Sequence, residues 1–402
     1  MARLETDKSS LLGIARYAAA EGWPVHTGLL AHLLGPFLDT WGEWTEAIHL
    51  HRLAVAAWRT TGNAAGEATA LIDLAFILFR TGQHAEAAES ARTALAAARS
   101  AADKGREAAA LDTLGVALSV SARYAEALAC HDQAILIWRD LGDRHGEADA
   151  LNRSGLPAVR LGRHPDALQR AELALAIYRE LGDLQGETKA LNNLGGMHQD
   201  AHCYDEALAS YQQVMATLRE TGDRQSEAIA LSNIGDIRQI SGHHDEALRN
   251  YRTALGIFRD IGDRRSEAEA LNGMAAAFTG AGDSQAALGH YERALVLASE
   301  LAERHTQAAS HLGIGSVHLL LGRCHSAADD YRIALKLSRE IADPVQEGRA
   351  LVGLGRALDA LGAPEAREHW QSALAIFEAV SSPEADDVRA LLERCRPAAS
   401  AS

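Results

Sequence analysis

Residues 184–263 repeat one segment: LQGETKALNNLGGMHQDAHCYDEALASYQQVMATLRETGD is followed directly by RQSEAIALSNIGDIRQISGHHDEALRNYRTALGIFRDIGD. The two segments align without insertion or deletion, so identical residues recur forty positions apart. Examples are Glu187 and Glu227, Leu191 and Leu231, Gly195 and Gly235, and Tyr211 and Tyr251. A fixed period of this length indicates a protein built from stacked repeats.

Each repeat is predicted to form two helices. Over residues 184–200, apolar and small side chains recur every three or four positions, which is the spacing of one helix face. The same spacing recurs over residues 204–220. At the junction, Gly222 can end a helix in the left-handed conformation, and Asp223 can cap the next helix. We expect Gly195 and Ala207 to lie where the two helices approach most closely, since a larger side chain would separate them.

The period extends over most of the chain. Junction residues recur at Asn63, Asp103, Asp143, Asp183, Asp223, Asp263, Glu303 and Asp343. The sequence therefore predicts an array over residues 24–382, with units starting near 24, 64, 104, 144, 184, 224, 264, 304 and 344. An N-terminal helix and linker at 1–23, helical over 9–21, precedes the array. A helix at 383–396, which covers the last apolar face, and a disordered tail at 397–402 follow it.

These motifs resemble those of a known family. Leu191-x-x-Leu194-Gly195-x-x-His198, followed by Ala207-x-x-x-Tyr211-x-x-Val214, is similar to the tetratricopeptide repeat (TPR), whose common form has a period of about 34 residues. The resemblance implies an all-α fold, a right-handed α-solenoid of about nine helix-turn-helix units. The longer period resembles the repeats of kinesin light chains and spindle-orientation adaptors. It also resembles the C-terminal arrays of actinomycete STAND-type transcriptional regulators, which join a signal-transduction NTPase to such repeats.

The composition narrows the classes of partner. The formal charge is −15, from 54 acidic and 39 basic residues, and no basic stripe occurs, so we expect no direct binding to nucleic acid. No run of 18 apolar residues occurs, so we expect no membrane span. The four cysteines are far apart and match no metal-binding spacing. We interpret them as reduced thiols of a cytoplasmic protein.

The search for catalytic motifs is negative. The sequence has no P-loop, no nucleophile elbow, no HExxH zinc motif and no dinucleotide fingerprint. His198, His202 and Cys203 lie close enough in sequence to suggest metal ligands, but they occupy positions that pack helices and turns in the family, so we assign them a structural role. His311 and His318 receive the same interpretation. We therefore predict a protein that is not an enzyme and carries no cofactor and no metal.

The candidate binding residues follow from the resemblance. In the TPR family the first helices of the repeats line a concave groove that binds extended peptides or partner helices. Asparagine both donates to and accepts from a peptide bond, so amides at inward positions suit this role. The alternative is an ordinary solvated face whose amides bond to neighbouring helices. The candidates are Asn152, Arg153, Arg160, Lys189, Asn192, Asn193, Gln199, Ser232, Asn233, Asp236, Gln239 and Asn272.

Apolar side chains are predicted at the two ends of this groove. Exposed apolar groups of this size indicate a contact surface, for a partner helix, a neighbouring domain or a second subunit. The residues concerned are Ile72, Phe76, Phe79, Leu312, Leu319 and Leu320.

Three hypotheses about function remain. The first is a protein- or peptide-binding scaffold, the sensory or regulatory module of a bacterial regulator whose NTPase domain lies outside this chain. The second is a self-standing receptor for a small peptide signal. The third, an enzyme, is supported by no group of residues.

Overall fold

The chain is helical throughout the part that the structure describes. The computed structural model describes residues 2–380 and 382–394, and these contain helices and turns but no strand. The helices fall into two compact units, the first ending at Ala190 and the second beginning at Leu191. We describe each unit by itself. The predicted all-α repeat fold is confirmed.

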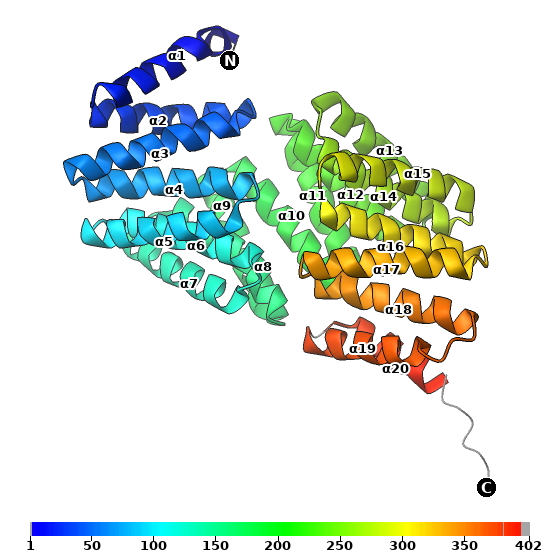
Figure 1. The fold of residues 1–402 in the computed structure, drawn as a ribbon. Coiled ribbons are helices and arrows are strands. Elements are labelled where there is room, and N and C mark those ends of the chain that lie inside the picture. Colours follow the sequence, from blue (N-terminus) through cyan, green and yellow to red (C-terminus); the bar gives the residue numbers. More distant parts are fainter. Residues whose placement is uncertain (1, 381, 395–402) are drawn as a thin grey trace. The chain divides into compact units, whose positions relative to one another are not determined.

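In the first unit the helices follow one another in a stack, from α1 in blue to α9 in green (Figure 1). Each helix packs against the next one along the chain, from α1 to α9. The helices are α1 (Ala2–Ala20), α2 (Pro24–Thr40), α3 (Trp44–Thr61), α4 (Ala64–Arg80), α5 (His84–Ser100), α6 (Lys104–Val120), α7 (Tyr124–Leu141), α8 (Arg144–Arg160) and α9 (His164–Leu181). The first helix begins at Ala2, earlier than the expected 9, because residues 2–8 are mostly good helix formers.

The next helix, α10 (Leu184–Asp200), contains the boundary between the units, and its bounds match the predicted 184–200. In the second unit, α11 extends one residue beyond the predicted end at 220. The predicted helix end at 396 and the tail at 397–402 lie outside the described residues. The remaining helices are α11 (Tyr204–Thr221), α12 (Arg224–Ile240), α13 (His244–Ile261), α14 (Arg264–Gly280), α15 (Ser284–Glu300), α16 (Arg304–Leu320), α17 (Cys324–Glu340), α18 (Pro344–Ala360), α19 (Ala366–Ala379) and α20 (Glu384–Arg394).

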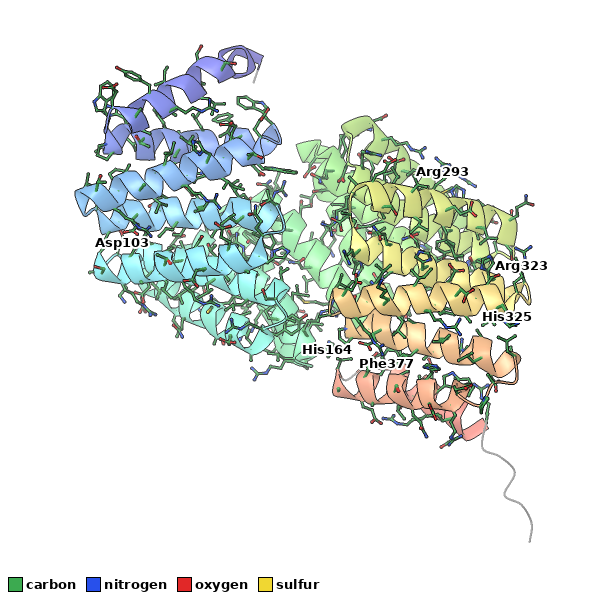
Figure 2. All side chains as sticks on the ribbon, viewed as in Figure 1. Asp103, His164, Arg293, Arg323, His325 and Phe377 are labelled. Atoms are coloured by element: carbon green, nitrogen blue, oxygen red, sulfur yellow. The ribbon has the colours of Figure 1, made fainter. Side chains whose placement is uncertain are left out.

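The junction residues cap the helices as the sequence predicts, with one exception. The side chain of Asp103, labelled in Figure 2, accepts a hydrogen bond of 2.9 Å from the backbone N–H of Arg106. Equivalent bonds form at Asn63, Asp143, Asp183, Asp223, Asp263 and Asp343. Glu303 makes no such bond, because its carboxylate lies one methylene farther from the backbone than that of aspartate.

An arginine and a glutamate eight residues apart bridge most of these junctions. Their side chains lie 2.5–2.8 Å apart, with the arginine near the end of one helix and the glutamate in the first turn of the next. Each partly exposed pair contributes only a few tenths of a kcal/mol, up to about 1 kcal/mol. The pairs are Arg59–Glu67, Arg99–Glu107, Arg139–Glu147, Arg179–Glu187, Arg259–Glu267 and Arg339–Glu347.

The structure adds a side chain to the close approach predicted at Gly195 and Ala207. A Cβ atom added at Gly195 would lie 2.5 Å from Cε1 of Tyr211, so this glycine makes room for the tyrosine ring. Tyr211 is 2% exposed, and Ala207 is also buried. The contact lies between the first helix of the repeat and a side chain of its second helix that points toward it.

The same arrangement recurs along the second unit. Each buried tyrosine of the second helices has a glycine on the first helix of its own repeat, of the next repeat, or of both. Tyr251 has glycines on both sides. Tyr291 has Gly313 beside it and shares a buried cluster with Ala275. The glycines of the inner helices therefore allow large rings between successive repeats. The ring and glycine sets are Tyr211 with Gly195, Tyr251 with Gly235 and Gly273, Tyr291 with Gly313, and Tyr331 with Gly315 and Gly353.

Candidate functional site

The first helices of neighbouring repeats contact one another as well as their own partners. In the first unit α2 contacts α4, α4 contacts α6 and α6 contacts α8; in the second unit α12 contacts α14, α14 contacts α16 and α16 contacts α18. We call the even-numbered helices α2–α18 the inner helices. All predicted binding residues lie on them: Asn152, Arg153 and Arg160 on α8, Lys189, Asn192, Asn193 and Gln199 on α10, Ser232, Asn233, Asp236 and Gln239 on α12, and Asn272 on α14.

Arg153, in the first unit, is held by two carboxylates. Its guanidinium forms ion pairs with Asp112 and, at 3.0 Å, with Asp149. Asp112 is 4% exposed and lies 2.7 Å from Nδ1 of the fully buried His131. Tyr178 donates a hydrogen bond of 2.6 Å to Asp149. The five side chains connect α6, α7, α8 and α9, so Arg153 stabilises the array and is not available as a separate charge for a ligand.

The electrostatics of this network favour an ionised Asp112. Burial alone would raise the pKa of Asp112, but the hydrogen bond with His131 and the charge of Arg153 outweigh it, so the pKa lies below the ordinary value. Among the other candidates of the first unit, Asn152 is buried and offers little surface to a ligand. Arg160 and Lys189 are exposed, and neither forms an ion pair with any residue in the described part of the chain.

Asn272, in the second unit, is bonded to the neighbouring inner helix. Its amide nitrogen donates to the backbone oxygen of Thr306 at 3.3 Å, and its oxygen accepts a hydrogen bond of 2.8 Å from the hydroxyl of Ser310. For this residue the structure supports the alternative that the sequence left open, an amide used between helices. Its polar atoms already have partners within the array.

Asn192 differs from Asn272 in its surroundings. The oxygen Oδ1 of Asn192 is shielded from solvent and has no hydrogen-bond partner among the described residues, and the same holds for the hydroxyl of Ser232. Ser310 lies 38 positions after Asn272, and the residue 38 positions after Asn192 is Ala230, which has no hydroxyl. Both unpartnered atoms belong to side chains that are only partly buried. The inner helices α10 and α12 thus present polar atoms that the fold leaves unsatisfied.

Asp236 lies one turn further along α12 and carries the most perturbed carboxyl of this face. Its Oδ1 accepts a hydrogen bond from the hydroxyl of Tyr251. Burial raises the pKa of Asp236 to about 6, and the Tyr251 hydrogen bond only partly opposes this shift. The Tyr211 ring lies against Gly195 of α10 and in one buried cluster with Ile237 of α12. Burial together with the carboxylates of Asp236 and Asp200 raises the pKa of Tyr211. Asn233, Gln199 and Gln239 are partly buried on the same helices, and Asn193 is exposed.

We predict that Asp236 makes stability depend on pH. Its raised pKa means that the folded state binds the proton more tightly than the unfolded state. The stability that this proton binding contributes is therefore fully present below about pH 4 and is lost as the pH rises through about 6. Asp236→Asn keeps an acceptor for Tyr251 without the charge. It should raise the free energy of unfolding at pH 8 by about 2 kcal/mol and change it little at pH 4.

Urea denaturation followed by circular dichroism at both pH values measures this difference. The exposed Asp359→Asn serves as the control, with an expected change within about 0.5 kcal/mol at either pH. An equal effect of Asp236→Asn at pH 4 and pH 8 would contradict the assignment.

The six apolar residues predicted at the ends of the groove differ in exposure. Phe76 and Leu320 are exposed, at 50% and 66%. Ile72 and Phe79 pack against the core of the first unit, and Leu312 and Leu319 pack against buried residues around Tyr331. These four side chains are partly buried because neighbouring inner helices lie close enough to cover them. Phe76 and Leu320 are therefore the most exposed of the six predicted side chains.

Three of the histidines considered as metal ligands bond to other side chains of the protein. His311 and His318 bond through Nδ1 to the two oxygens of Asp330, at 3.0 and 2.9 Å. His202 bonds through Nδ1 to the hydroxyl of Tyr204 at 2.7 Å. Within the described residues, no group of three or more histidine, cysteine or carboxylate side chains is arranged to hold a metal ion. Cys130, Cys203 and Cys324 are free thiols.

Helix pairs stacked at a forty-residue period define an α-solenoid repeat protein. A model of the tetratricopeptide repeat matches residues 42–100, 106–180, 187–260, 226–300 and 266–340, which is more than half of the chain. The chain therefore belongs to the tetratricopeptide repeat family. No curated protein sequence is significantly similar to it. None of the described helices is long and apolar enough to cross a lipid bilayer.

Solved structures share the fold at low sequence identity. A Rap protein complexed with Competence and Sporulation Factor is 15% identical, with a TM-score of 0.61, and the match covers 93% of this chain and 100% of that one. The apo quorum sensor NprR from B. thuringiensis is 15% identical, with a TM-score of 0.61 and coverage of 86% and 99%. A STAND protein with a tetratricopeptide repeat sensor from Pyrococcus horikoshii is 14% identical, with a TM-score of 0.57 and coverage of 86% and 55%.

Proposed function

We propose that this chain is a non-catalytic binding scaffold whose second unit holds an extended peptide segment against the inner helices. The observation that carries the proposal is the pair of shielded, unpartnered polar atoms, Oδ1 of Asn192 and Oγ of Ser232. A buried polar atom without a partner costs about 1–3 kcal/mol. A peptide backbone supplies the missing groups, since its N–H donates to the amide oxygen and its carbonyl accepts from the hydroxyl.

The neighbouring side chains suit the same ligand. Asn193, Asn233, Gln199 and Gln239 add amides that donate and accept without selecting a charge. Asp236 carries a proton in part of the neutral range, because its pKa is about 6, and it can then donate to a peptide carbonyl. This face would therefore hold the backbone of a ligand with little demand on its side chains.

The proposed setting is regulatory. One protein of similar fold is a STAND protein whose tetratricopeptide repeats are named a sensor, and this chain spans 55% of its length. This supports a sensory or regulatory module of a larger bacterial regulator, as the resemblance to actinomycete regulators implies. The second candidate is a self-standing receptor for a small peptide signal, favoured by the match over 99% of the quorum sensor NprR and 100% of the Rap protein. An adjoining NTPase gene would support the first role, and a gene for a short secreted peptide the second.

We predict that changing Asn192, Asn193 and Asn233 together to Ala strongly weakens peptide binding and leaves helicity intact. Peptides selected from a random 12-residue library on the intact protein serve as ligands, with affinity measured by fluorescence anisotropy. Loss of three amide contacts, each contributing about 1 kcal/mol, should weaken binding by about two orders of magnitude. Asn250→Ala on the second helix α13 is the matched amide control and should bind like the wild type. Unchanged affinity in the triple variant, or a library that yields no binder, would reject the proposal.

A further inference from the structure

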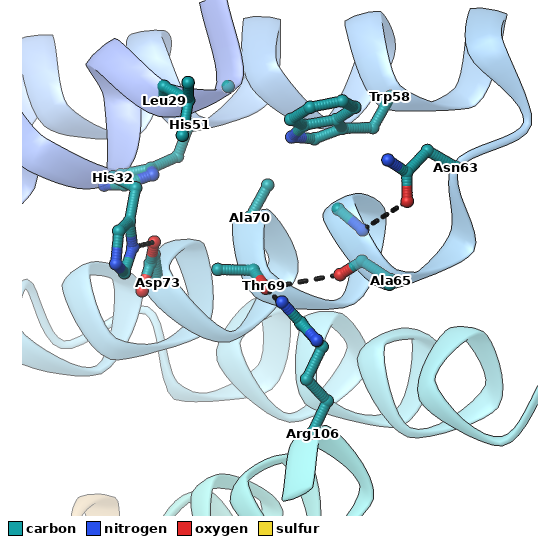
Figure 3. Close-up of a pocket in the computed structure, with 12 residues that line it drawn as sticks. Leu29, His32, His51, Trp58, Asn63, Ala65, Thr69, Ala70, Asp73 and Arg106 are labelled. Atoms are coloured by element: carbon teal, nitrogen blue, oxygen red, sulfur yellow. Dashed lines mark hydrogen bonds and ion pairs between the residues drawn. The ribbon is translucent and has the colours of Figure 1, made fainter. Parts of the chain in front are cut away.

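A pocket in the first unit lies outside the face described above. Its volume is about 310 Å³, at the lower end of the range for small-molecule sites. It opens among α2, α3, α4 and α6, with His32 and Asp73 at one side, Trp58 and Asn63 at the other, and Arg106 below (Figure 3). All of these residues belong to one compact unit.

Small residues leave this space open. In four later repeats, the residue at the position of Ala65 reaches the acid of the following junction: His145 to Asp183, Gln225 to Asp263, Arg265 to Glu303, and His305 to Asp343. Ala65 ends at its Cβ atom, and Asp103 pairs with Arg106 instead. At Gly28 and Gly66 the backbone contacts the Trp58 ring so closely that an added Cβ atom would overlap the ring. The indole edge therefore lines the pocket.

A buried imidazole on the pocket wall lacks a partner. His51 is 1% exposed, and its Nδ1 has no hydrogen bond to any described residue. The residue eighty positions later, His131, bonds through Nδ1 to Asp112. The position equivalent to Asp112 is occupied here by His32, which is itself bonded through Nδ1 to Asp73 at 2.7 Å. Burial lowers the pKa of His51, against the opposing effect of the Asp73 carboxylate, so the ring is held neutral.

Two opposite charges flank the same pocket without pairing to each other. Nε of Arg106 donates to the hydroxyl of Thr69 at 2.7 Å, and Thr69 lies one helical turn, about 6 Å, before Asp73 on α4. Asn63 uses its oxygen to cap α4, through a bond of 2.9 Å from the Gly66 N–H, which leaves its amide N–H groups for another acceptor. The wall thus offers an acceptor side at Asp73 and His51 and a donor side at Arg106 and Asn63.

We propose that this pocket binds a free α-amino acid as its zwitterion. The ammonium group bonds to the Asp73 carboxylate and the neutral His51 ring, and the carboxylate bonds to Arg106 and the Asn63 amide. The side chain of the ligand lies against Trp58 and Leu29, which favours an apolar or aromatic amino acid. Both charges lie within reach of one small ligand, because Arg106 bonds to Thr69, which lies one helical turn before Asp73 on α4.

Isothermal titration of the intact protein with each of the twenty amino acids tests this assignment. We expect at least one apolar or aromatic amino acid to bind at least tenfold more tightly than both its decarboxylated amine and its deaminated acid. Asp73→Asn should remove the preference over the acid, and Arg106→Gln should remove the preference over the amine. Arg144→Gln, an exposed arginine one repeat later, is the control and should bind like the wild type.

A filled pocket provides the second measurement. Ala65→His introduces the residue found at positions 145 and 305 and should abolish binding while the circular dichroism spectrum and the melting temperature stay within the range of the wild type. Binding by none of the twenty amino acids at 10 mM would overturn the proposal, as would equal affinity in Asp73→Asn, Arg106→Gln and Ala65→His. The outcome is separate from the peptide proposal, because no residue of the second unit is changed.

Discussion

Replacing Asp112 by isoleucine is expected to lower the free energy of unfolding of the first unit by about 3–5 kcal/mol. The change removes a buried carboxylate that bonds His131 and pairs with Arg153, so a buried imidazole and a guanidinium lose their shared partner. Removing one partner of a buried pair is strongly destabilising, because an uncompensated polar group stays behind. Replacing the whole pair by apolar residues costs much less. Urea denaturation monitored by circular dichroism measures the loss.

A double variant separates the loss of these polar contacts from poor packing of the introduced isoleucine. The preceding repeat has Ile72 and Ala91 at the positions of Asp112 and His131, so Asp112→Ile with His131→Ala copies an arrangement already present in the array. The double variant should recover at least half of the stability lost in Asp112→Ile. A double variant as unstable as the single one would contradict the account.

The same carboxylate has a pH signature of the opposite sign to that of Asp236. Because the pKa of Asp112 is lowered in the folded state, its contribution is present above about pH 4 and is lost as the pH falls further. The wild type should lose this part of its stability below about pH 4. The free energy of unfolding of Asp112→Ile should fall less steeply over the same acidic range.

Replacing Gly313 by alanine is expected to destabilise the second unit by about 2 kcal/mol. An added Cβ would overlap the ring of Tyr291, which shares a buried cluster with Ala275. Tyr291 is buried, so an overlap this large forces a packed ring to move, and overpacking of this kind costs about 1–3 kcal/mol. The gain of about 1 kcal/mol in helix propensity from glycine to alanine offsets only part of this cost. Thermal and urea denaturation measure the net change.

Gly315, on the same helix, supplies the matched control. A Cβ added there would lie 3.1 Å from Cε1 of Tyr331, whereas a Cβ at Gly313 would lie 2.2 Å from Cζ of Tyr291. The Tyr331 ring therefore needs to give by only a few tenths of an ångström. Gly315→Ala should be neutral or stabilising by up to about 1 kcal/mol. In a Tyr291→Ala background, Gly313→Ala should also become stabilising. Equal effects of the two glycine substitutions in the wild-type background would show that the tyrosine contact does not decide the cost.

The regular part of the fold could be predicted from the sequence, because local signals repeat with it. The glycine and aspartate at each junction end one helix and cap the next within a few residues, so the helices at 184–200 and from 204 onward were placed within one residue. The contact between Gly195 and the Tyr211 ring could not be predicted in the same way. Which side chains of the second helix reach Gly195 depends on the angle at which the two helices cross, and no local spacing encodes that angle.

The candidate site was less predictable, because it depends on pairs of residues in neighbouring repeats. Arg153 looks like a free charge in sequence, but its partner Asp112 lies 41 positions earlier on the adjacent inner helix. Asn272 and Asn192 occupy equivalent positions in their repeats, yet Ser310 satisfies only the first. The residue 38 positions later decides the state of each amide, and that offset is evident only once the inner helices are seen side by side.

That offset provides the most direct test of the proposed peptide-binding face. Ala230→Ser places a hydroxyl beside Asn192 as Ser310 lies beside Asn272, and it should satisfy the unpartnered amide oxygen from within the protein. Ala350→Ser is the control. Ala350 lies 38 positions after Leu312, which occupies the position of Asn192 and Asn272 in its repeat and has no amide to satisfy. The measurement is the affinity of a library-selected peptide for both variants. We predict at least tenfold weaker binding in Ala230→Ser at unchanged or higher stability, with wild-type binding in Ala350→Ser; wild-type affinity in Ala230→Ser would contradict the claim that Asn192 is held open for a ligand.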